Sequence, residues 1–268
     1  MPDLALDQPR GQPLYLTSPR LTEAGLPHLF TTRHFPGVTS PRDPGSPFDA
    51  DALRLLAELD VHAGPPAFLR QVHGADVLAA EQAGLVGRAD VVVTDRPGLP
   101  LAIFTADCVP LVLYDPVGRR LVLAHAGWRG TAAAAARAAA GALIAAGGAP
   151  ETFVGAIGPS IGPCCYEVDE PVIERLDAGF PGDWRGWVTA AGPGKWMLDL
   201  WRANVEQLRM DGLDPARIDN LELCTSCRAD LFFSYRRGRG QGRLVAVAAL
   251  PPGLKVTRAR ATGSTGSR

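Results

Sequence analysis

Three segments of the sequence each carry one side chain of a type that binds metal ions. They are QVHGAD with His73, TADCVP with Cys108 and HAGWRGT with His125. Each side chain lies just past a predicted strand, and loops at strand ends can converge above a rigid sheet. Two imidazoles and a thiolate suit Zn²⁺, and three protein ligands leave a fourth position for water or substrate. The three residues are therefore candidates for a catalytic zinc site, and their spacing leaves open the alternative of three unrelated loop or core residues.

The residues after His125 suggest an anion site. Gly127, Arg129 and Gly130 come immediately before a long predicted helix. Backbone N–H groups at a helix start, together with a guanidinium, favour an anion such as phosphate. Arg129 is thus a candidate catalytic and substrate-binding residue. The alternatives are a surface ion pair for Arg129 and a core position for Trp128.

Two carboxylates and one hydroxyl complete the candidate set. Asp107, beside Cys108, and Asp76 could orient ligands or carry protons, although each could instead cap a turn. Ser160 lies in GPSIG, which matches the nucleophile motif G-x-S-x-G. In α/β-hydrolases the histidine follows the serine, whereas all five histidines here precede Ser160. We therefore expect a Gly/Pro loop and retain Ser160 only as a substrate-binding candidate.

The other cysteines and an arginine-rich run are less specific. Cys164 and Cys165 are adjacent, and Cys224 and Cys227 form a C-x-x-C pair. A four-thiolate zinc site normally uses two spaced pairs, so we interpret these four residues as buried or reactive thiols. The run 235–243 contains four arginines and is interpreted as a solvated hairpin turn, with contact to an anionic substrate as the alternative.

The elements that must position these side chains follow from the hydrophobic pattern. Short apolar runs separated by Gly, Pro or Asp are typical of buried strands. They predict strands at 91–94, 101–105, 111–114, 121–124, 153–157, 220–223 and 244–250. Turn residues at 96–100 and 115–118 predict consecutive hairpins. Helices are expected at 131–146, 170–176 and 198–210.

This pattern predicts an α+β fold with a mixed sheet core and no linker that would divide it. We expect an irregular N-terminal arm at 1–20, one catalytic domain at 21–250 and a disordered basic tail at 251–268. Lys plus Arg total 27 and Asp plus Glu 28, so no net field attracts the chain to nucleic acid or a membrane surface. The sequence also lacks a membrane-length apolar run and a signal layout. With an odd number of cysteines, five, it is expected to be cytoplasmic.

Taken together, five motifs resemble the YfiH-like laccase-domain family. They are QVHGADV, TADCVPLVLYDP, HAGWRGT, IGPSIGPCCYEV and CTSCRADLFFSYRR, in order along nearly the whole chain. The resemblance implies an α/β/β/α sandwich with mixed sheets and zinc ligands at His73, Cys108 and His125. It also implies purine nucleoside phosphorylase activity with adenosine deaminase activity. The segment FTTRHFPGVT keeps Arg33, a candidate phosphate anchor, but lacks the family's double glycine and the Asn-containing stretch, which predicts a shorter loop beside the pocket.

Several functions are compatible with these residues. The leading hypothesis is a zinc enzyme that cleaves adenosine, inosine and methylthioadenosine with phosphate and also deaminates adenosine, with Cys108, His125, Asp107 and Arg129 as catalytic residues. Copper is the alternative ion, for weak polyphenol oxidation, but five histidines are too few for a multicopper cluster. Cys108 could instead be the nucleophile of a hydrolase that edits peptidoglycan precursors. A non-enzymatic site is the fourth hypothesis, and a monomer and a homodimer are equally compatible with the sequence.

Overall fold

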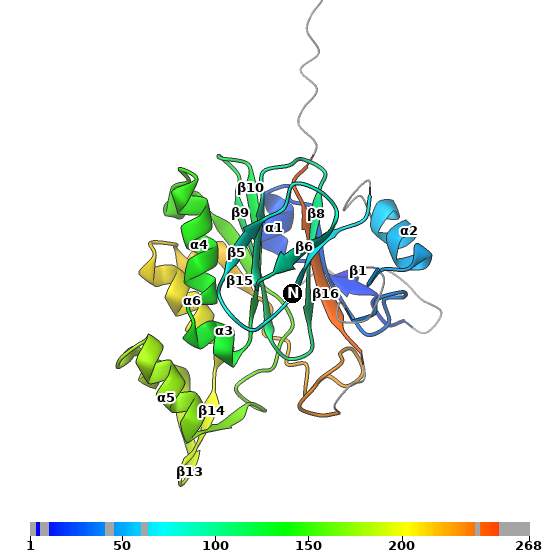
Figure 1. The fold of residues 1–268 in the computed structure, drawn as a ribbon. Coiled ribbons are helices and arrows are strands. Elements are labelled where there is room, and N and C mark those ends of the chain that lie inside the picture. Colours follow the sequence, from blue (N-terminus) through cyan, green and yellow to red (C-terminus); the bar gives the residue numbers. More distant parts are fainter. Residues whose placement is uncertain (1–3, 6–10, 41–45, 60–63, 239–241, 252–268) are drawn as a thin grey trace, which may run out of the picture.

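Two β-sheets form the centre of the molecule (Figure 1). The computed structural model describes residues 4–5, 11–40, 46–59, 64–238 and 242–251. The first sheet has the order β1-β2-β3-β16-β8-β4-β6. Its strands are Leu4–Ala5, Tyr15–Leu16, His28–Thr31, Leu244–Ala249, Pro100–Thr105, Ala67–Arg70 and Gly84–Arg88, in that order.

The second sheet has the order β15-β11-β9-β10-β7-β5. Its strands are Ile218–Asn220, Val154–Ile157, Val109–Asp115, Arg120–Ala126, Val91–Thr94 and Val77–Ala79. A small third sheet has the order β12-β14-β13, with strands Glu167–Asp169, Lys195–Leu198 and Val188–Gly192. Both large sheets contain parallel and antiparallel pairs, so the mixed-sheet prediction is confirmed.

Helices cover the outer faces of the two large sheets (Figure 1). In the described part of the chain these are α2 Ala50–Glu58 on the first sheet and α3 Trp128–Ala132, α4 Ala135–Ala145, α5 Glu170–Gly179 and α6 Leu200–Met210 on the second. A further helix, α1 Pro19–Glu23, packs its Leu21 into the core between the two sheets. Three 3₁₀ turns are Pro150–Thr152, Asp183–Trp187 and Pro215–Arg217. The described residues thus form the α/β/β/α sandwich that the sequence led us to expect.

Side chains of the central strands point alternately to the two faces of their sheet, and both faces are buried, which explains why these strands are almost wholly apolar. In β9, Val112 and Tyr114 pack between the two sheets, whereas Leu111 and Leu113 pack against α3 to α6. A strand covered on both faces has no side that favours polar residues. The same holds for β8, whose Leu101 faces the other sheet while Phe104 packs beneath α2.

The predicted hairpins are half correct. Strands β9 and β10 pair antiparallel through the turn after Asp115, whose carboxylate accepts from the N–H groups of Val117 and Gly118. Strands β7 and β8, however, belong to different sheets, so the turn at 96–100 is a crossover. Gly and Pro mark where the chain turns, but not which sheet the next strand joins.

The single predicted helix at 131–146 is wrong, because the structure has two helices there. They are α3 and α4, separated at Ala134, which adopts the left-handed conformation with φ 66°. Side chains from α6 compensate the break: Gln207 donates to the Thr131 carbonyl at 2.9 Å, and Asn204 donates to the Thr131 hydroxyl at 3.1 Å. Alanine propensity alone cannot reveal such partners, which come from a distant part of the chain.

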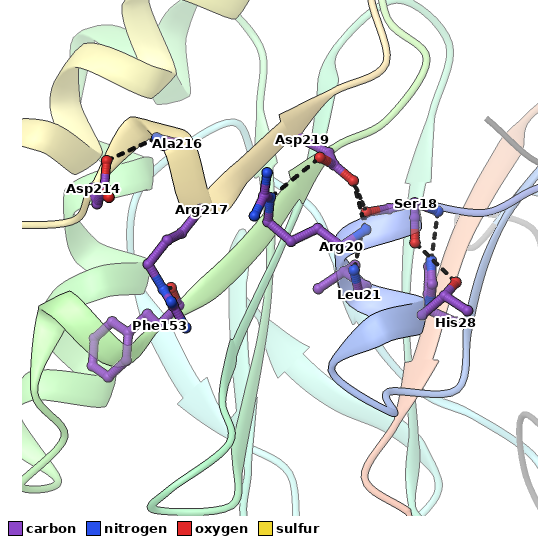
Figure 2. A network of polar contacts seen from close by, with 10 residues as sticks. Ser18, Arg20, Leu21, His28, Phe153, Asp214, Ala216, Arg217 and Asp219 are labelled. Carbon is purple, nitrogen blue, oxygen red and sulfur yellow. Dashed lines mark hydrogen bonds and ion pairs between the residues drawn. The ribbon is translucent and has the colours of Figure 1, made fainter. Parts of the chain in front are cut away.

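The predicted N-terminal arm is more regular than expected. It contributes β1 and β2 to the first sheet and begins α1. A polar network joins this region to β15 (Figure 2): the Asp219 carboxylate accepts from the Ser18 hydroxyl at 2.6 Å and from the Arg20 N–H at 2.9 Å. Buried His28 completes the network, with Nε2 accepting from the Ser18 N–H and Nδ1 donating to the Leu26 carbonyl. This histidine is structural, and burial lowers its pKa.

Two further expectations concern segments that lie wholly or partly outside the described residues. The predicted basic tail lies outside them from residue 252 onward, and so does part of the predicted short loop, at 41–45. None of the helices in the described part of the chain has both the length and the apolar character needed to cross a membrane.

Candidate metal centre and cavity

His73, Cys108 and His125 meet at one end of the sandwich. His73 follows β4, Cys108 lies between β8 and β9, and His125 is near the end of β10. Their ligand atoms all lie within 4.8 Å of one another. The two imidazole rings are 4.9 Å apart between centroids and inclined by 78°. The structure therefore brings the three predicted metal ligands together.

Crossovers between the sheets create this meeting point. The chain leaves the first sheet after β8 and enters the second at β9, and Cys108 lies on that passage. Gln71 anchors the neighbouring loop, because its side-chain amide donates to the Phe104 carbonyl at 2.7 Å and accepts from the Phe104 N–H at 2.9 Å. This pairing extends β4 alongside β8 and sets His73 beside Cys108. His73 itself has the left-handed conformation, with φ 64°.

Asp90 is a candidate functional residue that the sequence did not reveal. It is fully buried, and its Oδ1 lies 2.8 Å from Nδ1 of His125. Its Oδ2 accepts from the N–H groups of Val72 at 3.1 Å and Gly74 at 2.7 Å, on either side of His73. One carboxylate thus orients two of the three ligands, as supporting residues do at metal sites. The only sequence feature that could have pointed to Asp90 is its position as a charged residue directly before the apolar strand β7.

Asp76, which the sequence suggested for this role, is exposed and contributes its backbone instead. Its carbonyl accepts from the N–H groups of Asp90 and Val91. The chain near Asp76 therefore helps place Asp90, while the orienting carboxylate belongs to Asp90.

Charges in the site stabilise the form of Cys108 that binds metals. Burial raises the pKa of its thiol, but the charge and hydrogen bonds of His125 and His73 outweigh burial and lower the pKa to about 6. Burial likewise opposes the charged form of His125, whereas Cys108 and Asp90 raise its pKa to about 9. Between these two pKa values, metal-free protein carries a thiolate at Cys108 and an imidazolium at His125. A metal ion would displace the proton on His125, since only a neutral imidazole can be a ligand.

The three ligands lie on the wall of a cavity of about 620 Å³. This volume falls within the usual range for small-molecule sites. Four aromatic residues also line it: Phe104, Trp128, Tyr166 and Tyr235. Burial raises the pKa of Tyr166, with the nearby charge of Cys108 adding to the shift, so this phenol keeps its proton. A cavity with flat apolar rings can take a planar ring between them.

Arginines contribute positive charge to the cavity, but they are not the pair expected from sequence. Arg129 lines it and stacks on Trp128 at 4.2 Å from the ring centroid. Arg33 is instead used elsewhere: its guanidinium donates to the Ala229 carbonyl at 2.7 Å and lies over Phe233. Arg236 and Arg243, from the run interpreted as a solvated turn, do line the cavity. The expected dipole of a long helix is also missing, since α3 has five residues.

Asp107 lines the cavity, yet its carboxylate already accepts two hydrogen bonds. The donors are the Thr225 hydroxyl and the Arg236 N–H, both at 2.6 Å. Its place in the structure thus favours positioning of the loop that carries Arg236.

Ser160 is completely buried and does not line the cavity. Its hydroxyl donates to the Gly158 carbonyl at 3.2 Å and accepts from the Trp201 indole N–H at 2.7 Å. The predicted role in substrate binding is wrong, because both hydrogen-bonding functions of the hydroxyl serve the core. In this loop the G-x-S-x-G match reflects close packing: a Cβ on Gly162 would lie 2.6 Å from Trp201.

The remaining four cysteines, which the sequence led us to interpret as buried or reactive thiols, form a second cluster. One ligand atom from each lies within 4.8 Å of the others. Cys224 is buried, Cys165 is half-buried, and Cys164 and Cys227 are exposed. None of the five cysteines of the chain forms a disulfide.

Gly127 makes room for the three candidate metal ligands. A Cβ at this position would lie 2.6 Å from Sγ of Cys108 and 3.6 Å from Cδ2 of His73. We expect Gly127→Ala to displace Cys108 and to weaken zinc binding at least about tenfold, measured by competition with a chromophoric chelator. Gly74→Ala is the matched control, because its Cβ would meet only ordinary contacts at 3.7 and 3.9 Å. Equal zinc affinity in the two variants would contradict this account.

Fold and site together define an α+β sandwich whose crossover loops bring two imidazoles and one thiolate to the wall of a cavity. Comparison with known proteins agrees with this class. The chain belongs to the family described as "Multi-copper polyphenol oxidoreductase laccase", whose model matches residues 41–251. The YfiH-like resemblance is thereby confirmed.

Named relatives and solved structures cover most of the chain. It is 36% identical over 252 residues to "Purine nucleoside phosphorylase" of Deinococcus radiodurans, covering 90% of this chain and 94% of that protein. It is 41% identical over 196 residues to "Purine nucleoside phosphorylase YlmD" of Geobacillus stearothermophilus, covering 66% and 69%. The crystal structure of Bacillus licheniformis YfiH, described as a hypothetical protein, superposes with a TM-score of 0.80 at 29% identity, covering 90% of this chain and 97% of that one.

Proposed function

We propose that this protein is a zinc-dependent purine nucleoside phosphorylase that also deaminates adenosine. Its substrates would be adenosine, inosine and methylthioadenosine, which phosphate converts to the free base and ribose 1-phosphate or methylthioribose 1-phosphate. The observation that carries the proposal is the convergence of His73, Cys108 and His125 on a cavity lined by aromatic rings and arginines. The names of its relatives support the phosphorylase activity.

The donor set fits zinc. Cys108 and His125 supply soft and borderline ligands, His73 supplies the third, and Gly127 leaves the space that their side chains need. A bound zinc ion would supply Lewis acidity at its open fourth position. Asp90 holds the ring of His125 so that Nε2 is directed toward the centre of the site.

The remaining cavity residues suit the other parts of the reaction. Trp128 and Tyr166 offer flat surfaces for the purine, and each already has an arginine stacked on it, Arg129 and Arg236. Guanidinium groups bind phosphate oxygens through paired N–H donors. Arg129, Arg236 and Arg243 would therefore hold phosphate against the ribose, where charge develops as the glycosidic bond breaks. Tyr166, which keeps its proton, would donate a hydrogen bond to the purine or the phosphate.

Product analysis tests the proposal directly. The zinc-loaded protein is incubated with adenosine, with and without phosphate, and adenine, ribose 1-phosphate, inosine and ammonia are measured. Hypoxanthine is measured as well, because inosine formed by deamination is itself a substrate for phosphorolysis. We expect ribose 1-phosphate to form only with phosphate and in an amount equal to adenine plus hypoxanthine, and inosine to form in either buffer. Absence of ribose 1-phosphate under all conditions would overturn the phosphorylase proposal. Absence of inosine would remove the deaminase activity alone.

A second candidate function rests on Cys108, His125 and Asp90. A thiolate beside an imidazolium that a carboxylate orients is the arrangement of a cysteine hydrolase. In this hypothesis the Cys108 thiolate would attack the carbonyl of an amide or ester of a peptidoglycan precursor and form a thioester, while the amine or alcohol leaves with a proton from His125. Water would then cleave the thioester, and zinc would inhibit the enzyme by occupying the nucleophile.

Alkylation of Cys108 separates the two functions and tests the lowered pKa. Because only the thiolate reacts, the labelling rate of metal-free protein should rise with pH with a midpoint of about 6, far below the 9.0 of an ordinary thiol. Mass spectrometry of iodoacetamide-treated protein locates the label. Zinc should protect Cys108. If iodoacetamide labelled Cys108 in zinc-loaded protein and abolished its enzymatic activity, the hydrolase hypothesis would replace the phosphorylase proposal.

Copper is the alternative ion, because the family description refers to copper oxidases. A site with one thiolate and two imidazoles can bind either metal. Metal analysis of protein purified without added copper distinguishes the two: we expect zinc. A copper-loaded protein that oxidises phenols would support the oxidase instead.

A further inference from the structure

The four cysteines outside the candidate active site come from two loops that lie side by side. Cys164 and Cys165 are in the turn before Tyr166, and Cys224 and Cys227 are in the loop after β15. Backbone hydrogen bonds join the loops: Ser160 donates to the Leu223 carbonyl at 3.2 Å, and Thr225 donates to the Ser160 carbonyl at 3.0 Å. The sulfurs therefore approach one another on a hydrogen-bonded framework.

The geometry points to a metal site. Sγ of Cys227 lies 3.5 Å from Sγ of Cys164 and 3.4 Å from Sγ of Cys165, with Cys224 in the same group. In a tetrahedron with Zn–S bonds of about 2.3 Å, the sulfurs are about 3.8 Å apart. Cys227 contacts two other sulfurs at almost equal distances, so the sulfurs form a cluster and not one disulfide pair. We propose that Cys164, Cys165, Cys224 and Cys227 bind a second, structural zinc ion.

The surroundings of the cluster suit thiolate ligands. The Gly162 N–H donates to Sγ of Cys224 at 3.3 Å, and the N–H groups of Ser226 and Cys227 also donate to it. Such N–H to sulfur bonds stabilise the negative charge on a coordinating thiolate. Arg237 adds positive charge beside the loop, since its guanidinium donates to the carbonyls of Thr225 at 2.7 Å and Ser226 at 2.9 Å.

The second ion would brace one wall of the cavity. Cys165 directly precedes Tyr166, which lines the cavity. Cys224 directly precedes Thr225, whose hydroxyl donates to Asp107, and Asp107 in turn accepts from the Arg236 N–H. A zinc ion that ties the two loops together would therefore hold Tyr166 and Arg236 in place. Its effect on turnover is indirect, through the positions of these side chains.

Metal stoichiometry tests this proposal without reference to catalysis. The full chain, without a polyhistidine tag, is expressed in zinc-supplemented medium and purified under reducing conditions, and zinc per chain is measured by mass spectrometry. We expect two zinc ions in the wild type, one in Cys108→Ser and one in Cys227→Ser. Cys164→Ser serves as a second variant, because both positions are exposed and the substitutions should leave the fold intact. Ser226→Ala is the control within the same loop and should keep two ions.

Two further measurements identify the ligands. Cobalt(II) added to Cys108→Ser should give sulfur-to-metal charge-transfer absorption, which the Cys108→Ser/Cys227→Ser double variant should lack. Loss of the second ion should lower Tm by roughly 5–10 °C. The proposal would be overturned if the wild type bound one zinc ion per chain and Cys108→Ser bound none. A native disulfide between Cys227 and Cys164 or Cys165 in reduced, zinc-supplemented preparations would also overturn it.

Discussion

His125→Ala is expected to lose the active-site zinc and to reduce phosphorolysis and deamination of adenosine at least about a thousandfold. Metal catalysis contributes several kcal/mol of transition-state stabilisation, and about 4 kcal/mol corresponds to roughly a thousandfold in rate. The variant removes one of three ligands and leaves a Cys/His pair that holds zinc weakly. Zinc content and the initial rates of ribose 1-phosphate and inosine formation measure the effect.

The controls must separate metal loss from unfolding. His125 is almost fully buried and pairs with Asp90, so its removal leaves a buried carboxylate without its partner. Cys108→Ser is therefore measured in parallel, because it removes a ligand while keeping the His125–Asp90 pair. His34→Ala is the histidine control, since His34 is exposed and its ring Nε2 lies 2.8 Å from the Asp230 carbonyl oxygen. Turnover equal to wild type in His125→Ala and Cys108→Ser would show that the metal site is not catalytic.

Asp90→Asn has the second largest expected effect, a zinc affinity reduced about 10- to 100-fold. The carboxylate accepts hydrogen bonds on both oxygens, from His125 on one and from Val72 and Gly74 on the other. An asparagine has only one accepting oxygen. Its NH₂ group would either face the two backbone N–H donors or donate to Nδ1 of His125, which places the ring proton on Nε2 and blocks coordination.

Chelator competition measures this loss, and Asp76→Asn provides the matched control. Asp76 is exposed, and the structure uses its carbonyl, which the substitution retains. We expect wild-type zinc affinity for Asp76→Asn, with turnover of Asp90→Asn partly restored at high zinc concentration. If Asp76→Asn weakened zinc binding as much as Asp90→Asn, the roles assigned to the two carboxylates would be wrong.

The two cysteine groups have different relations to the cavity. Cys108 lies on its wall beside His73 and His125, where a ligand can approach. The four-cysteine cluster lies behind Tyr166 and Thr225, where an ion would be surrounded by sulfur and have no open position. The expected consequences differ accordingly: loss of the first ion removes activity, whereas loss of the second lowers stability and alters the cavity wall.

Local chemistry was sufficient to select the candidate ligands. Soft donors in short loops after apolar runs pointed to His73, Cys108 and His125, and the structure brings these three together. The same runs predicted buried strands at 91–94, 101–105, 111–114 and 121–124, which correspond to β7, β8, β9 and β10. These features depend on neighbouring residues, so they are visible in a single segment.

Long-range packing decided the rest. Whether β8 pairs with β7 or joins the other sheet depends on the packing between the layers. The return of the chain from β8 to β9 in the second sheet brings Cys108 to the two histidines. Asp90 and Arg236 reach the site through such contacts, while Arg33 and Ser160 are drawn into contacts elsewhere. The sequence by itself determined these four central strands and the chemically capable side chains. Only the tertiary structure decided which of them meet, because that depends on burial and pairing between segments far apart in the chain.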